Sequence, residues 1–254
     1  VYPISILDLM NQGYLVRPRY FAPSTPDLSG IKITKGEYDN RQLDNVMQEN
    51  AIQGDVVETW KKFGENRPSL MFAVSVKHSL LLTERFNRAG VAAAHIDANS
   101  SQAERNEIIE KLIAGNIKVI SSVGVLTTGF DCPPVSCLIG CRPTMSKNLH
   151  IQMIYRGTRP FPGKNDFIVL DHSGNLEKHG FIEDELPCDL DGEKKKEKSK
   201  IPPVVNCRAC LSVYYASSEC CPSCGAVNPS LKKEKERKLK EVAAEFEEKK
   251  RLEI

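Results

Sequence analysis

Hydrophobic residues between positions 69 and 171 are gathered in short runs, separated by longer stretches with helical or loop character. The five runs are Leu70–Val76, Val91–Ile96, Ile117–Ser121, Val135–Gly140 and Asp166–Leu170. Mainly apolar runs of this length, without strict alternation, are typical of strands that are covered on both faces. The pattern therefore predicts an α/β fold in which a parallel sheet carries helices on both faces.

The helix between the second and third runs is the clearest in the sequence. Ser101 and Glu104 have the spacing of a capping box, in which both side chains accept hydrogen bonds from free amides at a helix start. One apolar stripe follows, formed by Ile108, Ile109, Leu112 and Ile113. Gly115 is placed to end this helix.

The regions outside the alternating pattern differ in composition, and they divide the chain into five parts. We expect a lead-in with helices and an inter-domain segment over residues 1–68, and an α/β domain over residues 69–188. A charged stretch, with five lysines against four acidic residues in DLDGEKKKEKSK, predicts a solvated linker over 189–201. A cysteine-rich module follows over 202–228, and a Lys/Glu-rich helical tail over 229–254.

Composition narrows the class of protein without identifying it. The formal net charge of the 254 residues is only +2, so global charge makes no case for nucleic acid, and local sites must make it. No apolar run approaches the length of about 18 residues that spans a bilayer. The chain begins Val1-Tyr2-Pro3, without an initiator methionine or a signal peptide, so we expect a piece of a longer protein.

Four of the nine cysteines lie in two C-x-x-C pairs within 18 residues, Cys207/Cys210 and Cys221/Cys224. Two such pairs supply four thiolates for a tetrahedral zinc ion, and so small a unit has too little core to fold without one. Cys220 is an alternative to Cys221, although the spacing favours Cys221. We expect structural zinc and a reducing, cytoplasmic setting. The module could stack bases on Tyr214 and Tyr215 beside Arg208, or serve only as a scaffold.

Three strings carry candidate chemistry. VLTTGFDC, residues 125–132, offers hydroxyls, amides and a glycine suited to a phosphate. QMIYRGTRP, residues 152–160, places two arginines three apart, and arginine suits the charge that develops during phosphoryl transfer. LDHSGN, residues 170–175, ends a strand on a glycine turn. Each string alone has a simpler interpretation, such as a glycine turn or a pair of surface arginines in a salt-bridge network.

Their order and spacing resemble motifs V and VI of superfamily 2 helicases, together with the R-P-T string at residues 142–144. The pattern is similar to the C-terminal RecA-like domain of the DEAD/DEAH-type proteins, in particular the RadD-like and phage helicases. The strand ending at Ser75 then looks like motif IV, and the helix start at residues 99–101 looks like an accessory phosphate-contacting motif. The resemblance covers roughly residues 1–176 and implies a RecA-like domain, to which the cysteine spacing adds an expected zinc ribbon.

The resemblance also implies roles for single residues. Arg156 and Arg159 look like arginine fingers for the γ-phosphate of ATP, and Gln152 like a contact to that phosphate or to the attacking water. Gly129 and Asp131 look like the residues that couple the state of the bound nucleotide to the binding of the nucleic-acid strand. The implied contacts to the nucleic-acid backbone are Ser75, Ser100, Thr127 and Thr128.

Some positions depart from the family pattern. Tyr155 stands where a glycine usually precedes the first finger, and its bulk could narrow the nucleotide cleft. Ser100 stands where threonine is commoner. No G-x-x-x-x-G-K-[ST] string occurs in the 254 residues, so the cradle for ATP and Mg²⁺ belongs to a first RecA-like domain absent from this sequence. We therefore expect the enzyme to be a nucleic-acid-dependent ATPase whose activity this chain alone does not have.

Three hypotheses about function remain open from the sequence. The first is the C-terminal motor domain of an ATP-dependent helicase or translocase, acting on DNA in repair or phage replication, with RNA as the alternative substrate. The second is a nucleic-acid-binding module that does not hydrolyse ATP. The third is a duplex translocase subunit of a restriction or defence complex.

Overall fold

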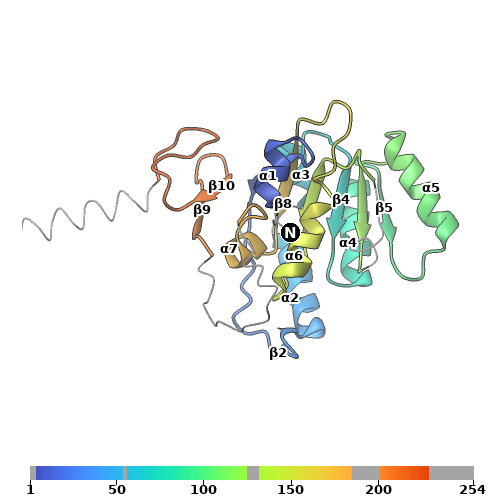
Figure 1. The fold of residues 1–254 in the computed structure, drawn as a ribbon. Coiled ribbons are helices and arrows are strands. Elements are labelled where there is room, and N and C mark those ends of the chain that lie inside the picture. Colours follow the sequence, from blue (N-terminus) through green and yellow to red (C-terminus); the bar gives the residue numbers. More distant parts are fainter. Residues whose placement is uncertain (1–3, 54–55, 125–131, 185–200, 229–254) are drawn as a thin grey trace, which may run out of the picture. The chain divides into compact units, whose positions relative to one another are not determined.

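A computed structural model describes residues 4–53, 56–124, 132–184 and 201–228, and it divides the chain at residue 201 into two compact units. The larger unit is built on a six-stranded sheet with the order β1-β8-β7-β4-β6-β5, in which every strand pair is parallel. Figure 1 shows this sheet crossed by its helices. The predicted α/β fold, a RecA-like parallel sheet, is confirmed.

The strands of this sheet are β1 Arg17–Phe21, β4 Ser69–Phe72, β5 Ala93–Ile96, β6 Val119–Ser122, β7 Cys137–Gly140 and β8 Asp166–Asp171. The helices are α1 Ile6–Asn11, α2 Asn40–Gln53, α3 Val56–Phe63, α4 Val76–Arg88, α5 Gln102–Ile113, α6 Lys147–Tyr155 and α7 Asn175–His179. A short hairpin of β2 Ile33–Thr34 and β3 Glu37–Tyr38 precedes α2. Each of the five apolar runs in the sequence overlaps a strand of the sheet, so that part of the prediction is also confirmed.

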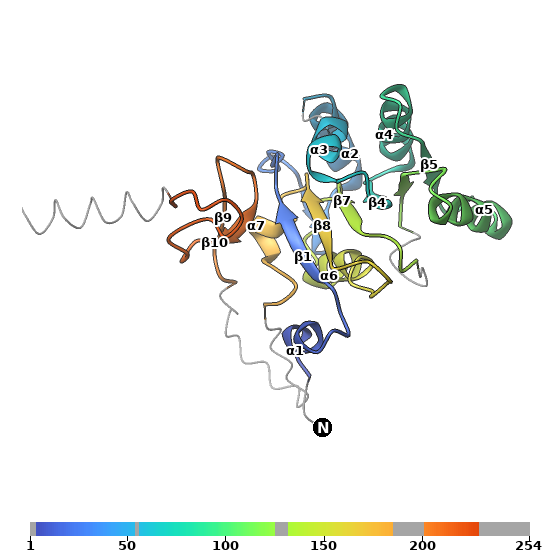
Figure 2. The ribbon, with the colours of Figure 1, turned by 90° about the horizontal axis from the view of Figure 1, so that it is seen from above.

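Helices cover the sheet on both sides. Figure 2 shows α3 and α4 on one side and α6 on the other. Trp60 of α3 and Phe86 of α4 are almost fully buried and pack edge to face, with ring centroids 5.8 Å apart. The opposite face of the sheet contributes buried residues such as Leu138 and Phe167, because successive side chains of a strand point to opposite faces.

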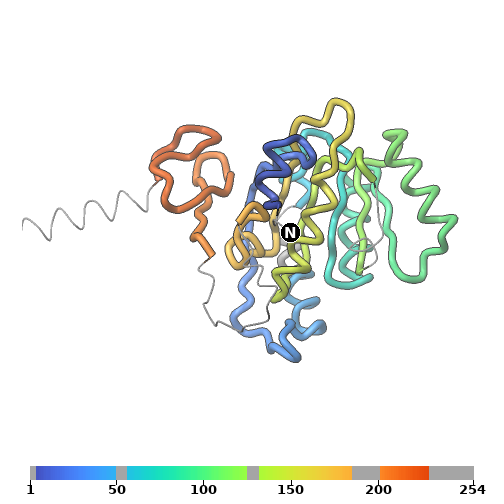
Figure 3. Tube along the Cα trace, viewed as in Figure 1, coloured from blue at the N-terminus to red at the C-terminus, as the bar shows by residue number. Residues whose placement is uncertain are grey.

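The first strand of the sheet comes from the segment that the sequence pattern treats as a lead-in. Arg17 to Phe21 pair in parallel with Asp166 to Leu170, about 150 residues later in the chain. Figure 3 traces this N-terminal segment, in blue, alongside β8. Trp60 of α3 lies in the core of the same sheet. Residues 17–21 and Trp60 are therefore part of the sheet and core of the RecA-like unit.

The helix predicted from the capping box begins where expected. Ser101 accepts a hydrogen bond from the Glu104 amide, and the Glu104 carboxylate accepts one from the Ser101 amide. Gly115 follows the helix with a φ of +79°, in the left-handed region that favours glycine. The apolar stripe is buried only in part, because Leu112 is 1% exposed whereas Ile113 is 57% exposed.

The smaller unit contains a two-stranded antiparallel sheet of β9 Val204–Asn206 and β10 Val213–Tyr215. It includes the four clustered cysteines. The predicted tail helix lies outside the described residues. Within the ranges that the structure describes, no helix has the length and apolar character needed to cross a membrane.

Candidate functional site

Gln152 and Arg156 lie one turn apart at the end of α6. The neighbouring residues Ile151, Met153 and Ile154 are buried against the sheet, whereas the Gln152 side chain is exposed. Arg156 is the C-cap of the helix and is half-buried, and Arg159 is exposed three residues later. The structure therefore places all three predicted nucleotide-contacting residues on one short segment.

Packing holds residues 152–159, the arginine segment, in place. A Cβ atom at Gly157 would lie 2.4 Å from Cδ2 of Phe167, so the backbone touches the core too closely for any side chain. The Thr158 hydroxyl and amide both donate to the carbonyl of Tyr155, and the Thr158 carbonyl accepts from the Val16 amide at 2.8 Å. Tyr155 itself is half-buried, and burial raises the pKa of its hydroxyl. The position that packing requires to be glycine is therefore Gly157, two residues after Tyr155.

The loop that leads into α6 is fixed by side chains from distant parts of the chain. Asn175, almost fully buried, accepts from the Thr144 amide at 3.0 Å and donates to the Arg142 carbonyl at 2.9 Å. Glu37 accepts from the Thr144 hydroxyl and from the Met145 amide, each at 2.7 Å. These contacts explain why the R-P-T and L-D-x-x-G-N strings occur together, since Asn175 clamps the loop that contains Thr144. Sequence reasoning missed this structural role, because the contact joins residues about 30 positions apart and no local pattern marks it.

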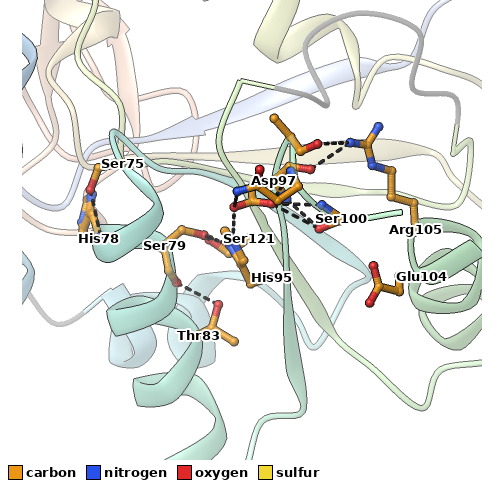
Figure 4. Close-up of polar contacts among 12 residues, drawn as sticks. Ser75, His78, Ser79, Thr83, His95, Asp97, Ser100, Glu104, Arg105 and Ser121 are labelled. Carbon is orange, nitrogen blue, oxygen red and sulfur yellow. Dashed lines mark hydrogen bonds and ion pairs between the residues drawn. The ribbon is translucent and has the colours of Figure 1, made fainter. Parts of the chain in front are cut away.

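Ser75 lies at the other end of the sheet, where it follows β4 after Ala73 and Val74. Its hydroxyl caps α4 by accepting from the His78 amide at 3.0 Å (Figure 4). The same hydroxyl donates to the Asp44 carboxylate at 2.5 Å. The Ser75 hydroxyl proton is therefore already used within the protein.

Ser100 follows the end of β5, in a turn that is organised by Asp97. The Asp97 carboxylate accepts from the amides of Asn99 at 2.8 Å and Ser100 at 3.2 Å. Those two amides therefore point toward Asp97 instead of outward. The Ser100 hydroxyl accepts from the Asp97 amide at 3.1 Å, and its contact to the carboxylate is long, at 3.4 Å. Its proton is thus held weakly and can turn toward an external acceptor.

A buried polar chain joins the elements that carry these two serines. Figure 4 shows Ser79, His95 and Ser121 gathered between α4 and the strands. The Ser79 hydroxyl lies 2.6 Å from Nδ1 of His95 and 2.5 Å from the Ser121 hydroxyl, and Nε2 of His95 lies 3.5 Å from the Asp97 carboxylate. Ser79 and Ser121 are fully buried, so these contacts satisfy hydroxyls that would otherwise be costly in the core. In the sequence, His95 showed no pattern that pointed to this role.

The predicted residues thus fall into two groups at opposite ends of the sheet. Ser75 and Ser100 follow the carboxyl ends of β4 and β5, which flank β6 in the sheet. The arginine segment packs on Phe167, near the amino end of β8, because α6 runs back along the sheet. The remaining predicted residues, Thr127, Thr128, Gly129 and Asp131, lie outside the described residues.

Four cysteine sulfurs of the smaller unit, from Cys207, Cys210, Cys221 and Cys224, lie within 4.8 Å of one another. Two of the sulfur pairs, Cys207–Cys224 and Cys210–Cys221, are 3.6 and 3.7 Å apart. Tetrahedral Zn–S bonds of about 2.3 Å give sulfur pairs about 3.7 Å apart, whereas a disulfide is about 2.05 Å long. Both the donor set and its spacing fit a zinc ion. Cys220 is exposed and is not in the cluster.

The two halves of this cluster have the same backbone hydrogen bonds. The Cys207 amide donates to Ser212 and its carbonyl accepts from the Leu211 amide; Cys221 makes the equivalent bonds with Ala226 and Gly225. Leu211 and Gly225 both have positive φ, of +61° and +74°. The module is therefore a pair of matching turns that each present two thiols.

The interpretation of Tyr214 as a base-stacking residue is wrong. Tyr214 is 3% exposed and packs against Cys207 and Cys221 inside the module. A unit of this size has few other large side chains to bury, which explains why the aromatic ring is used as core. Tyr215 is half-buried and Arg208 is exposed.

Comparisons with known proteins agree with this architecture. Residues 54–160 match the family described as the helicase conserved C-terminal domain. The chain is 30% identical, over 220 residues, to a 51.5 kDa protein of a Lactococcus phage (isolate 7-9), a match that covers 85% of this chain and 48% of the phage protein. It is 29% identical over 178 residues to the "Putative ATP-dependent helicase IRC3" of Saccharomyces cerevisiae, covering 68% of this chain and 26% of that protein.

The chain therefore spans about half the length of the phage relative and about a quarter of the yeast one. Among solved structures, the fold is similar to "a putative HsdR subunit of a type I restriction enzyme from Vibrio vulnificus YJ016", with a TM-score of 0.53 at 15% identity. That match covers 71% of this chain and 37% of the other. At this identity the likeness concerns the fold alone.

Proposed function

Residues 54–160 are the helicase C-terminal domain of a superfamily 2 protein, and on that premise we propose that this chain is the second motor domain of an ATP-dependent helicase or translocase. The observation that carries the proposal is the arginine segment. Gln152, Arg156 and Arg159 lie together at the end of α6, on a backbone that the core holds rigidly. A phosphoryl-transfer site needs positive charge that is fixed in place before the reaction.

In this proposal the first motor domain holds ATP and Mg²⁺, and the second domain completes the site. Arg156 and Arg159 supply positive charge to the γ-phosphate oxygens as water attacks the γ-phosphorus and its bond to the bridging oxygen of the leaving ADP breaks, and Gln152 contacts the γ-phosphate or the attacking water. Gly129 and Asp131 link this site to the strand-gripping residues. The sequence has no phosphate-cradling lysine loop, so the chain alone does not turn over ATP.

Nucleic acid is proposed to lie along the carboxyl ends of β4, β5 and β6. Ser100 offers a hydroxyl whose proton is held weakly and can turn toward a phosphate, and Ser75 lies at the same edge. Thr127 and Thr128 are proposed as further contacts to the backbone. Hydroxyl contacts to phosphates bind the backbone without reading its sequence. DNA is the proposed substrate, and RNA is the outcome to test against it.

The four cysteines are proposed to hold one structural zinc ion. Four thiolates close the coordination sphere, so this site has no open position for a substrate or water. The ion would supply most of the folding energy of a unit that has only one buried aromatic ring in its described cluster. Catalysis therefore belongs to the larger unit.

ATP turnover tests the proposal directly. The chain alone should show no ATP hydrolysis, with or without single-stranded DNA. The same chain joined to its upstream domain should hydrolyse ATP. Arg156→Ala should reduce that turnover about 10³-fold or more, the scale expected for an arginine finger. Arg88→Ala, which removes an exposed arginine of α4 that pairs with Glu84, is the matched control and should leave turnover unchanged.

Turnover by the isolated chain, or an Arg156→Ala enzyme as active as the control, would overturn the two-domain arrangement. A forked duplex and a triplex-displacement substrate, run side by side, then separate unwinding from movement along an intact duplex. Strand separation supports a helicase, and displacement without separation supports a translocase.

A further inference from the structure

The Ser75 hydroxyl, a proposed nucleic-acid contact, is bound by a carboxylate from another helix. Asp44 of α2 accepts the Ser75 proton at one oxygen, at 2.5 Å, and accepts from Nε2 of Gln48 at the other, at 2.7 Å. Asp44 and Gln48 are one turn apart, so both lie on the same side of α2. The carboxylate is therefore oriented by its own helix toward Ser75.

The position of α2 makes this contact a stable feature of the fold. Leu43 and Met47 are each 3% exposed, and they belong to a cluster against which Val74 packs. Val74 is the residue immediately before Ser75. The same turn of helix that buries Leu43 thus presents Asp44 at the start of α4.

In the described part of the chain, the negative charge of Asp44 is not paired with a cation. Over the residues that the structure describes, no lysine, arginine or histidine lies within ion-pair distance of this carboxylate. Its charge does act on His78, yet burial lowers the pKa of His78 to about 4, so that ring is neutral at neutral pH. A phosphate that approaches Ser75 therefore meets an uncompensated anion.

We propose that Asp44 is a further residue of the nucleic-acid site, occupying on Ser75 the place that a backbone phosphate takes when nucleic acid binds. Carboxylate and phosphate oxygens both accept strongly from a hydroxyl, and one proton serves only one of them at a time. Binding therefore has to displace Asp44, which weakens the grip of the free domain. This inference rests on the proposed role of Ser75.

The test measures binding of the full chain to a fluorescein-labelled oligothymidylate by fluorescence anisotropy at low ionic strength. Asp44→Asn keeps an acceptor for Ser75 and removes the charge, so it should tighten binding about fivefold to tenfold. Ser75→Ala should weaken binding, and in that background Asp44→Asn should lose most of its effect. Glu84→Gln is the matched control, because it also removes one acidic charge. Glu84 lies on α4 nine residues after Ser75, a distance of about 13 Å along the helix.

A gain of affinity is informative because a misfolded variant does not produce it. If Asp44→Asn tightens binding no more than Glu84→Gln, Asp44 only fastens α2 to α4 and the inference is wrong. If it tightens binding equally in the Ser75→Ala background, the effect is general repulsion, and displacement at Ser75 is wrong. If the wild-type chain and the Ser75→Ala variant bind alike, the proposed contact at Ser75 itself fails.

Discussion

Replacing Gly157 by alanine tests whether the core really holds the arginine segment in place. The added Cβ would lie 2.4 and 2.7 Å from two ring carbons of Phe167 and 3.1 Å from Cδ1 of Leu138. Carbon atoms in contact prefer separations of about 3.5–4.0 Å, so the ring and the backbone must separate by about 1 Å. Phe167 is 0% exposed and Leu138 is 2% exposed, which leaves neither side chain a free direction in which to move.

We therefore expect Gly157→Ala to lower the free energy of unfolding by about 1–3 kcal/mol, the range for overpacking a core. Urea unfolding followed by the fluorescence of Trp60, the only tryptophan in the sequence, measures this change. Gly30→Ala is the control, because no atom lies within 4 Å of its added Cβ. That variant should change stability by less than about 1 kcal/mol, in either direction.

A second substitution isolates the contact itself. Phe167→Leu replaces the ring with which the added Cβ of Gly157→Ala would clash by a smaller side chain. The double variant should therefore lose less free energy of unfolding than the sum of the two single losses. A coupling of about 1 kcal/mol or more supports the close packing. Additive losses, or a Gly157→Ala protein as stable as the Gly30→Ala control, would refute the reasoning.

Three further predictions concern charge and metal. Burial lowers the pKa of His78 to about 4 and of His150 to about 3, so the unfolded chain takes up protons below about pH 6.5 that the folded chain does not. The free energy of unfolding should therefore have its full value above about pH 6.5 and fall progressively toward pH 4. Urea unfolding midpoints at several pH values measure this change, and a midpoint that does not vary with pH contradicts it. Chelation should release one zinc per chain and unfold the small unit while leaving the fluorescence of Trp60 unchanged, and a loss of that signal would contradict separate folding. At Gly225 an added Cβ would meet no atom within 4 Å, but the backbone φ of +74° strains any residue other than glycine. Competition with a chelator should therefore show that Gly225→Ala weakens the free energy of zinc binding by about 1 kcal/mol. An unchanged zinc affinity would count against the paired-turn geometry.

Local signals in the sequence were sufficient for much of the larger unit. Each apolar run marks a strand because a parallel sheet buries both faces, and the capping box at Ser101 marks a helix start because its hydrogen bonds are made within one turn. The C-x-x-C pairs likewise carry their own spacing information. These features depend on residues that are near one another in the chain, which is why the pattern alone predicts them.

Features that depend on distant residues were not predictable in the same way. The pairing of β1 with β8 joins segments about 150 residues apart, and nothing in residues 17–21 names that partner. The clamp of Asn175 on Thr144 and the contact of His95 with Ser79 likewise exist only after folding brings separate elements together. The sequence left the role of Tyr214 open, because an aromatic residue in a small module serves equally well as core or as surface, and the structure shows that it is buried.

The separation of the two candidate sites bears on how the proposed motor would work. Ser100 lies at the carboxyl edge of the sheet and Arg156 near the amino end of β8, with parallel strands and buried side chains between them. A packed sheet of this kind does not deform continuously, so a change at the arginine segment moves the unit as one body. The element with two states is then the cleft between the two motor domains, since closing it on ATP carries Ser100 along with Arg156. Beside the proposed link at Gly129 and Asp131, coupling between nucleotide and nucleic acid therefore depends on the rigidity of this domain, so loosening the core at Gly157 should impair both functions together.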